Sequence, residues 1–361
     1  MARGCLRMPS APDSNPDCDV IPFPQETQSP HVLVTGASGF LGSEIVRQLA
    51  ASGGSVRALA RQWSTGETVP RNVVRCTGDI TQPATLWPAL DGVKTIVHSA
   101  GLAHQFGKKS TRPELFHQVN TQGTEAVMRA AVAANVEHVI LVSSVSVYGG
   151  GCQPTNESSP CRASDPYGGS KLQAEQIASQ IAEATGTRLT ILRMATIFGE
   201  GDPGNIRRLM QTIDQGRFIW LGTGSNRKSL IYRDDAARAC VLAVTTKTHN
   251  SAGSESVQVY NVSLPPVPVS SIVAALSTGL GRPTPHWYIP APLVRTMGGG
   301  LSLCMAGRGP AARIHRTITK WLSDDIYPGE RFERDYGFQP QVSLEEGLRR
   351  ETAWFRHSKA A

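Results

Sequence analysis

Cysteine is scarce in this chain: seven residues are scattered over 361 positions, without a CxxC pair. No histidine lies at metal-ligand spacing from them, so the pattern predicts neither a zinc site nor a disulfide framework, and we expect no bound metal. The odd number of cysteines and the length of the chain favour a reducing compartment. We therefore expect a cytoplasmic protein.

Long hydrophobic runs are also absent. The most apolar stretch, residues 287–305, is interrupted by Arg295 and by three consecutive glycines that begin at Gly298. A membrane-spanning helix needs roughly 20 predominantly apolar residues. We therefore expect no membrane span, and the stretch remains a candidate for an exposed hydrophobic lid or interface.

Runs of one charge are missing as well. Charged residues make up 18% of the chain and the formal net charge is +7, yet no long basic segment occurs. This balance indicates mild attraction for phosphate groups, and we expect no nucleic-acid partner. Residues 1–30 carry six prolines and several charges without the apolar core of a signal peptide, and we expect a disordered N-terminal arm there.

Short apolar runs alternate with longer amphipathic stretches from residue 31 onward. Six runs are typical of buried strands: HVLVTG, SVRALA, NVVRC, TIVHSA, HVILVSS and RLTILR. Strands and helices in alternation predict a parallel sheet that is covered by helices on both faces. We therefore expect an α/β fold with a Rossmann-type, doubly wound sheet over residues 31–199.

A smaller α/β lobe is predicted after Gly199, where the alternation loosens. The segments FIWLG, LIYRDDAARACVLAV and VQVYNV mix short strands with isolated helices. Ser343 followed by Glu346 forms a capping-box pattern, which predicts a closing helix. We expect residues 200–361 to form predominantly a substrate-binding lobe.

Three glycines, Gly36, Gly39 and Gly42, separate the first predicted strand from the first predicted helix. At such a turn, backbone N–H groups and the helix N-terminus can bind the pyrophosphate of a dinucleotide. The alternative is that the glycines only permit a tight turn and close helix packing. Three glycines at one strand end exceed what a turn requires, so we expect a cofactor-binding loop.

The end of the second strand bears on the choice between NAD and NADP. An acidic residue there binds the adenosine ribose of NAD, whereas an arginine accommodates the 2′-phosphate of NADP. The strand ends VRALARQ without a carboxylate, so Arg61 favours NADP unless it is only a surface charge. Asp79 and Ile80, after the third strand, suit the adenine edge or, alternatively, the start of a helix.

The segment SDPYGGSK, residues 164–171, places a tyrosine and a lysine four residues apart, directly after a proline. In a helix that begins at Pro166, Tyr167 and Lys171 lie one turn apart on the same face. A neighbouring ammonium favours the phenolate, so the pair could act as a general acid/base near neutral pH. The alternative is a surface helix whose lysine has no catalytic role.

With TGASGFLG, GDI, HSAG, SSVSVYG and YGGSK in this order, the chain resembles the extended short-chain dehydrogenase/reductase family, which includes NAD-dependent nucleotide-sugar epimerases and dehydratases. The resemblance covers residues 31–356. It implies an enzyme that transfers hydride at a secondary alcohol or carbonyl, with NAD or NADP as cofactor.

The resemblance also implies catalytic roles. Tyr167 is the expected acid/base, and Lys171 lowers its pKa while it holds the nicotinamide ribose. Ser144, with Ser143 as the nearby alternative, orients the reacting oxygen. Asn120 helps to order the site unless it is a solvent-facing helix residue. The implied cofactor-binding residues are Gly36, Ser38, Gly39, Phe40, Leu41, Gly42, Arg61, Asp79, Ile80, Ala100, Tyr167 and Lys171.

The resemblance narrows the reaction. Dehydratases of the family carry an Asp-Glu pair directly after the catalytic serine or threonine, whereas Val145 and Ser146 follow Ser144 here. This difference favours an epimerase of nucleotide sugars, most of all of UDP-sugars.

Three positions in the second half bear on the substrate. Asn205 and Arg227 match the family's diphosphate-binding residues, although the arginine could equally be a surface charge. Thr196 stands where the family has a sugar-binding asparagine, which weakens the sugar assignment.

Two other readings stay open. One is an NADP-dependent reductase or dehydrogenase of a less polar alcohol or ketone, similar to the hydroxysteroid dehydrogenase and dihydroflavonol reductase branch. The other is a dinucleotide sensor without catalysis. By analogy with relatives, we expect a homodimer.

Overall fold

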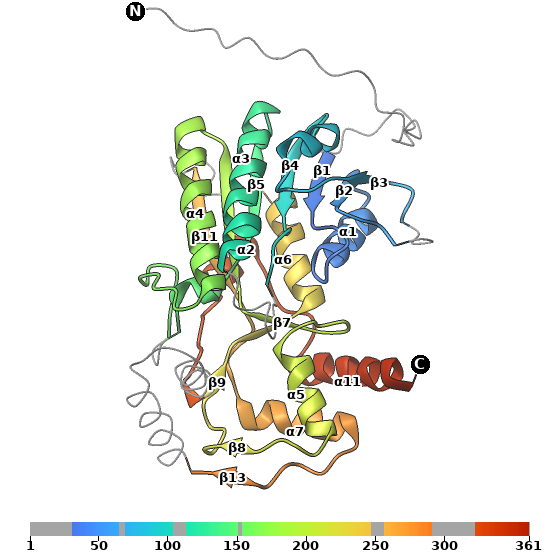
Figure 1. Cartoon of the computed structure of the whole chain (residues 1–361), viewed down its shortest axis with the longest axis vertical. Coiled ribbons are helices and arrows are strands. Elements are labelled where there is room, and N and C mark those ends of the chain that lie inside the picture. The colour runs from blue at the N-terminus through green and yellow to red at the C-terminus, as the bar shows by residue number, and fades with distance from the viewer. Residues whose placement is uncertain are drawn as a thin grey trace, which may run out of the picture.

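Seven parallel strands form the central sheet of the protein (Figure 1). The chain builds one half of the sheet from its first three strands, returns to the middle, and builds the other half. Across the sheet the order is β11 (Val257–Val262), β6 (Arg188–Met194), β5 (His138–Ser144), β4 (Val93–His98), β1 (His31–Thr35), β2 (Val56–Ala60) and β3 (Val73–Thr77). The six predicted strands and the doubly wound Rossmann-type sheet are confirmed.

The computed structural model describes residues 31–64, 69–103, 113–150, 154–246, 256–290 and 322–360. The predicted N-terminal arm lies outside these ranges, as does most of the apolar stretch 287–305. The strand order reverses between β1 and β4, and sheets of this kind bind their ligands at the carboxyl ends of the strands at such a point.

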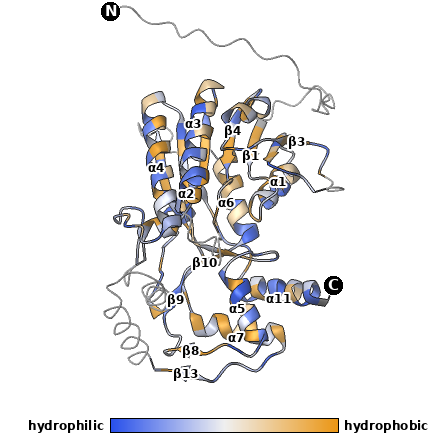
Figure 2. Cartoon of the chain, in the orientation of Figure 1, coloured by the Kyte–Doolittle hydropathy of each residue, from blue (hydrophilic) through white to orange (hydrophobic). Residues whose placement is uncertain are grey.

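Helices cover both faces of the sheet, because strands in a parallel sheet are apolar on both sides. One face is covered by α1 (Gly42–Ala51) and α6 (Arg233–Thr245), which share a hydrophobic core with it. The other is covered by α3 (Gly123–Ala133) and α4 (Pro166–Thr185). Figure 2 shows the strands β1 and β4 as hydrophobic, whereas α3 and α4 carry both hydrophilic and hydrophobic residues.

Two segments that sequence pattern assigned to the smaller lobe belong to the sheet layer. The VQVYNV segment is β11, which pairs along its whole length with β6. Helix α6 packs on α1, and α10 (Glu330–Tyr336) packs on β11. The physical reason is that both segments gain partners there: the backbone of β11 pairs with β6, and the apolar residues of α6 share a core with α1 and the sheet.

The smaller lobe has its own core, at the opposite end of the molecule from β1–β4 in Figure 1. Its helices are α5 (Asn205–Asp214), α7 (Val269–Leu280) and α11 (Leu344–Ala360). Its strands are β7 (Thr196–Phe198), β8 (Trp220–Leu221), β9 (Arg227–Lys228), β10 (Leu230–Tyr232), β12 (Val267–Pro268) and β13 (Tyr288–Ile289). The predicted cap of the closing helix is confirmed, since the Ser343 hydroxyl accepts a hydrogen bond from the Glu346 N–H.

The contact between α7 and α11 yields a stability prediction. A Cβ atom at Gly279 would lie 2.3 Å from Oγ1 and 2.9 Å from Cβ of Thr352. Overpacking of this kind costs about 1–3 kcal/mol, so we expect Gly279→Ala to lower the denaturant midpoint of unfolding. Thr352→Ala in the same chain should restore part of the loss, and an unchanged midpoint for the single variant would contradict this packing.

Candidate active site

The turn from β1 to α1 is built from backbone that only glycine allows. Gly36 has φ of +69°, and a Cβ atom on it would lie 2.7 Å from the Ala100 Cα. A Cβ on Gly42 would lie 2.1 Å from the Gly36 carbonyl oxygen, and the Gly39 N–H donates to that same oxygen. Ser38 and Gly39 are exposed at the tip. The turn therefore lies, without bulky side chains at its glycines, at the N-terminus of α1, which suits an anionic pyrophosphate.

The other predicted cofactor residues lie around the same edge of the sheet. Arg61 follows β2 and is exposed, and the Ala100 N–H donates to the Thr35 hydroxyl. Phe40 lies beneath the Arg233 guanidinium of α6, 5.7 Å from ring centroid to Cζ, while Leu41 packs against the core.

Asp79 and Ile80 have local roles. The Asp79 carboxylate accepts hydrogen bonds from the N–H and hydroxyl of Thr81 at the turn before a short 3₁₀ segment, Pro83–Ala89. Ile80 is buried, and a Cβ on Gly123 would lie only 2.7 Å from its Cδ1. Gln82 is the N-cap of the 3₁₀ segment, so Asp79 holds the preceding turn and not the start of the helix, and an adenine contact by Asp79 stays a prediction.

A buried chain of hydrogen bonds fixes the end of β4. The Thr124 hydroxyl donates to the Asn120 carbonyl, so Nε2 of His98 must donate to Thr124, and Nδ1 then accepts from Thr35. Burial, and then the nearby charge of Lys171, lowers the pKa of His98 to about 3. His98 is therefore a neutral structural residue.

Asn120 lies in a π-helical turn, His117–Gln122, between α2 (Pro113–Phe116) and α3. In this wider turn Asn120 lies inward and is 1% exposed. Its amide accepts from the Leu102 N–H and donates to the Leu102 carbonyl and the Ser170 hydroxyl. Asn120 is thus not solvent-facing, and it ties the loop after β4 to α4.

Helix α4 begins at Pro166, as predicted, and the Asp165 side chain caps it by accepting the Gly168 N–H. Tyr167 and Lys171 accordingly lie one turn apart. Tyr167 shares a hydrogen bond with Ser144, the last residue of β5. Burial raises the pKa of Tyr167, the Ser144 hydrogen bond lowers it, and the charge of Asp165 raises it again. The group that lowers the pKa of Tyr167 in the structure is thus Ser144, whereas the sequence predicted this role for Lys171.

Lys171 is buried at 7% exposure, and its ammonium donates to the Val142 carbonyl of β5 over 2.9 Å. Burial lowers the pKa of Lys171 to about 8, and the charge of Glu175 opposes that effect. A Cβ on Gly101 would lie 3.2 Å from the Lys171 Nζ, so the backbone after β4 passes close to the ammonium. The site thus combines a phenol, a hydroxyl and a partly desolvated cation at the carboxyl ends of β4 and β5.

The predicted substrate residues lie in three separate elements of the smaller lobe. Thr196 begins β7 and is half-buried, and Asn205 is exposed at the start of α5. Arg227 is exposed on β9, where its guanidinium donates to the Pro266 carbonyl. A direct approach of these side chains to Tyr167 is not seen in the hydrogen bonds of the described residues.

Sequence pattern missed several residues that support this site. Ser170 holds Asn120, and Glu175 and Arg193 form a buried ion pair beside Lys171. The spacing of Glu175, four residues after Lys171, was the available signal. Nothing local distinguishes Arg193, because its partner comes from another element.

Adjacent glycines in α4 provide a matched test of the site's packing. A Cβ on Gly168 would lie 2.4 Å from the Ser146 carbonyl oxygen, whereas a Cβ on Gly169 meets nothing within 4 Å. We expect Gly168→Ala to destabilise the protein by about 1–3 kcal/mol. Gly169→Ala should stabilise it by up to about 1 kcal/mol, because alanine favours helix. Urea unfolding measures both, and equal effects of the two variants would refute this geometry.

Neither a membrane helix nor a metal cluster occurs in the part of the chain that the structure describes. No helix there is long and apolar enough to cross a bilayer. Within the same ranges, no group of three or more His, Cys, Asp or Glu side chains is placed to hold a metal ion.

A doubly wound sheet, a glycine turn after β1 and a tyrosine–lysine pair on the helix after β5 together define an extended short-chain dehydrogenase/reductase. The chain belongs to the NAD dependent epimerase/dehydratase family, whose model matches residues 32–263. It is therefore an enzyme of this NAD-dependent family.

Known relatives include enzymes of different substrate classes. The chain is 32% identical over 265 residues to N-acetyl-alpha-D-glucosaminyl-diphospho-ditrans,octacis-undecaprenol 4-epimerase of Escherichia coli O157:H7, covering 73% of this chain and 76% of the relative. It is 29% identical to 2-alkyl-3-oxoalkanoate reductase of Stenotrophomonas maltophilia, covering 88% and 97%. Among solved structures, MoeE5 in complex with UDP-glucuronic acid and NAD superposes with a TM-score of 0.70 at 26% identity, covering 91% and 99%.

Proposed function

We propose that this enzyme is a nucleotide-sugar epimerase whose substrate is a UDP-sugar. The observation that carries the proposal is the meeting of the Tyr167 and Ser144 hydroxyls, with Lys171 one helical turn away. A substrate alcohol needs one group to move its proton and a second to hold its oxygen. The relative from Escherichia coli and MoeE5 support the sugar class.

The residues at the carboxyl ends of β1 and β4 fit a nicotinamide dinucleotide. The glycine turn of Gly36, Gly39 and Gly42 has no side chains to block a close approach, and it leads into the N-terminus of α1, which we assign to the pyrophosphate. Gly101 lets the backbone approach Lys171, which we assign to the nicotinamide ribose. When bound, the cofactor supplies a hydride acceptor and donor.

Residues of the chain accept and return the proton of the substrate hydroxyl. Tyr167 as phenolate takes the proton of the substrate hydroxyl, and it returns the proton when the carbonyl is reduced on its other face. Burial raises the pKa of the phenol and the Ser144 hydrogen bond lowers it. We assign the further stabilisation of the phenolate to the Lys171 charge, because a nearby cation favours the charged form of a phenol. Ser144 holds the reacting oxygen as its charge changes.

Elimination of water needs a further acid/base pair, which dehydratases carry directly after this serine. Here Val145 follows and is buried, and Ser146 hydrogen-bonds back to Ser144 through its N–H. Neither position supplies a carboxylate. We therefore assign epimerisation ahead of dehydration.

For the nucleotide part, we assign Asn205 and Arg227 to the diphosphate because an amide and a guanidinium both suit phosphate oxygens. Thr196 would contact the sugar in place of the asparagine that the family carries there.

A reductase of a less polar ketone is the second candidate. Three observations favour it: the 97% coverage of the alkanoate reductase, the absence of the sugar-binding asparagine at Thr196, and the exposure of Trp287 (71%) and Tyr288 (68%) at the start of the apolar stretch. The two functions differ in stoichiometry. An epimerase regenerates its cofactor in each cycle, whereas a reductase consumes it.

Replacement of the phenol tests the chemistry. We expect Tyr167→Phe to lower turnover of UDP-sugars about 10²–10⁴-fold, the range that a general acid/base contributes, while bound dinucleotide is retained. Tyr288→Phe, at an exposed tyrosine of β13, is the matched control and should keep full activity in the epimerase. Steady oxidation of added NADPH by a ketone, without epimerisation of any UDP-sugar, would replace the proposal with the reductase.

We further propose NADP as the preferred cofactor, because Arg61 is exposed directly after β2 and no carboxylate stands there. A charge-assisted hydrogen bond contributes about 1.5–3 kcal/mol. Arg61→Ala should therefore weaken NADP binding roughly ten- to hundredfold and leave NAD binding nearly unchanged. Arg217→Ala, at an exposed arginine of the smaller lobe, is the control. Release of NAD from the denatured protein, with no effect of Arg61→Ala, would overturn the preference.

We also infer a homodimer that associates through helices of the core, by analogy with relatives. Light scattering on the purified protein gives the mass directly, and a monomer at working concentration would exclude it.

A further inference from the structure

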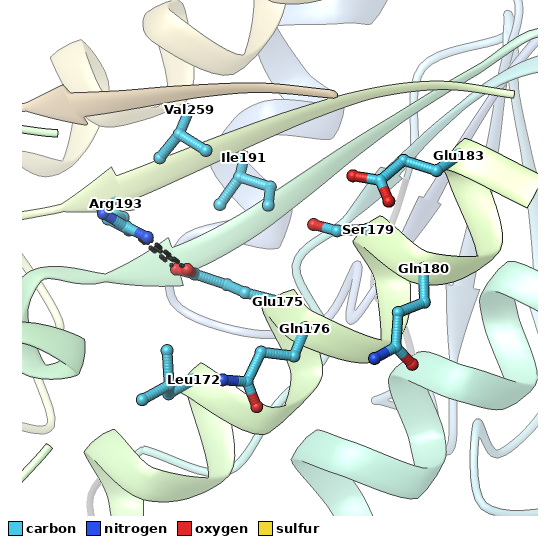
Figure 3. Close-up of a pocket in the computed structure, with 9 residues that line it drawn as sticks. All are labelled: Leu172, Glu175, Gln176, Ser179, Gln180, Glu183, Ile191, Arg193 and Val259. Carbon is cyan, nitrogen blue, oxygen red and sulfur yellow. Dashed lines mark hydrogen bonds and ion pairs between the residues drawn. The ribbon is translucent and has the colours of Figure 1, made fainter. Parts of the chain in front are cut away.

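A buried ion pair lies beside the candidate active site without being part of it. Glu175 of α4 and Arg193 of β6 are joined at 2.7 Å between Oε2 and Nη2, and their side chains are 5% and 8% exposed. The Arg193 Nε also donates to both carboxylate oxygens, which gives the forked geometry drawn in Figure 3. Such geometry fixes a carboxylate in orientation as well as in position.

Further hydrogen bonds tie this pair to the catalytic strand. The Ser143 hydroxyl, next to Ser144 at the end of β5, donates to Oε1 of Glu175. Arg193 donates to the Tyr148 hydroxyl, which in turn donates to the Asn261 side chain of β11. The pair therefore joins α4 to three neighbouring strands, β5, β6 and β11.

Stability alone does not explain a buried ion pair. Removing two charges from water costs several kcal/mol per ion, and well-packed apolar residues often replace such pairs without loss. Burial works against the charge of Arg193, yet its hydrogen bonds and charge contact with Glu175 raise its pKa. Arg193 thus keeps its charge in the interior, and its forked contact holds the Glu175 carboxylate in place. Charges act more strongly on their neighbours there than in water.

Lys171 lies one helical turn before Glu175 on α4, and a negative charge near it would favour its ammonium form. Its ammonium has the neutral Val142 carbonyl as its hydrogen-bond partner. The titratable groups around it are Tyr167 on its own helix, the neutral His98 of β4, and Arg193 of β6 beyond the carboxylate. Among the described residues, Glu175 is the carboxylate whose charge acts on Lys171.

We propose that Glu175 is a positioning residue: its carboxylate, fixed by Arg193 and Ser143, is the counter-charge that keeps Lys171 an ammonium beside Tyr167. The proposal rests on the proposed function, in which the ammonium favours the phenolate. Glu175 acts through Lys171 and does not touch the substrate.

The sign of the pH effect follows from burial. Burial lowers the pKa of Lys171 to about 8, and Glu175 opposes this shift. Below that pH Lys171 is charged, and above it the charge is lost. Without the carboxylate the same loss occurs at lower pH, so the alkaline limit of activity moves toward neutrality.

The shape of the surroundings decides which variant to use. An open groove of about 300 Å³ lies over the pair, between α4 and the strands β6 and β11, with Gln176 and Gln180 along its helix side (Figure 3). Truncation of Glu175 to alanine would let water reach the interior through this groove. Glu175→Gln keeps the shape and removes only the charge.

The decisive measurement is the titration of Lys171, followed by competitive acetylation and mass spectrometry across pH. In Glu175→Gln we expect its apparent pKa to fall by about one unit or more, as for loss of a close opposite charge. The alkaline limb of kcat/KM should move by the same amount. Glu175→Asp should largely restore both. Glu125→Gln, which breaks an exposed ion pair with Arg129 on α3, should change neither.

An unchanged Lys171 titration in folded Glu175→Gln would overturn the proposal. If that variant does not fold because Arg193 is left unpaired, the double variant Glu175→Gln/Arg193→Gln removes both charges. Loss of the more distant Arg193 charge raises the Lys171 pKa in part, so a smaller fall of this pKa is required of the double variant. The labelling needs no substrate. Absence of UDP-sugar turnover in the wild type would therefore defeat the proposed function while leaving the Lys171 measurement to decide this inference.

Discussion

The structure depends on one costly feature, a lysine ammonium held almost out of water at the end of β5. Lys171 reaches the Val142 carbonyl across the packing between α4 and the sheet, and burial favours its neutral form. The groups around Lys171 differ in their charge and in their role. His98 stays neutral, Asn120 holds the adjacent loop in place, and the helix supplies a carboxylate one turn further on.

The parts of the site come from different elements, and side-chain hydrogen bonds link these elements to one another. The loop after β4 is fixed to α4 through Asn120 and Ser170, and the end of β5 is fixed to the same helix through Ser143 and Glu175. A change in the position of α4 would therefore move the phenol, the hydroxyl and the cation together. Groups arranged in this way keep their mutual distances, which general acid/base chemistry requires.

Much of this arrangement could be predicted from sequence because its signals are local. The glycine turn, the helix start at Pro166 and the cap at Ser343 each depend on a few consecutive residues, and all three are present. The position of β11 could not be predicted, because the residues of a short strand do not show which other strand it pairs with, and its partner β6 lies far away in sequence. The same limit applies to Arg193, which lies 18 residues from its partner Glu175, and to the π-helical turn that turns Asn120 inward.

The order of the strands also governs how the chain can fold. β11 completes the large sheet, yet α5 and several short strands of the smaller lobe lie between it and β6 in sequence. Until residue 262 has been made, β6 is the edge strand of the sheet, and its unpaired backbone groups are a template for mispairing with other chains. Such long-range pairing slows folding, and in a fragment cut at Gly199 the strand β6 would stay at the sheet edge without its partner. The large sheet is thus completed by a strand that is made only after the first part of the smaller lobe, including α5, and before α7 and α11.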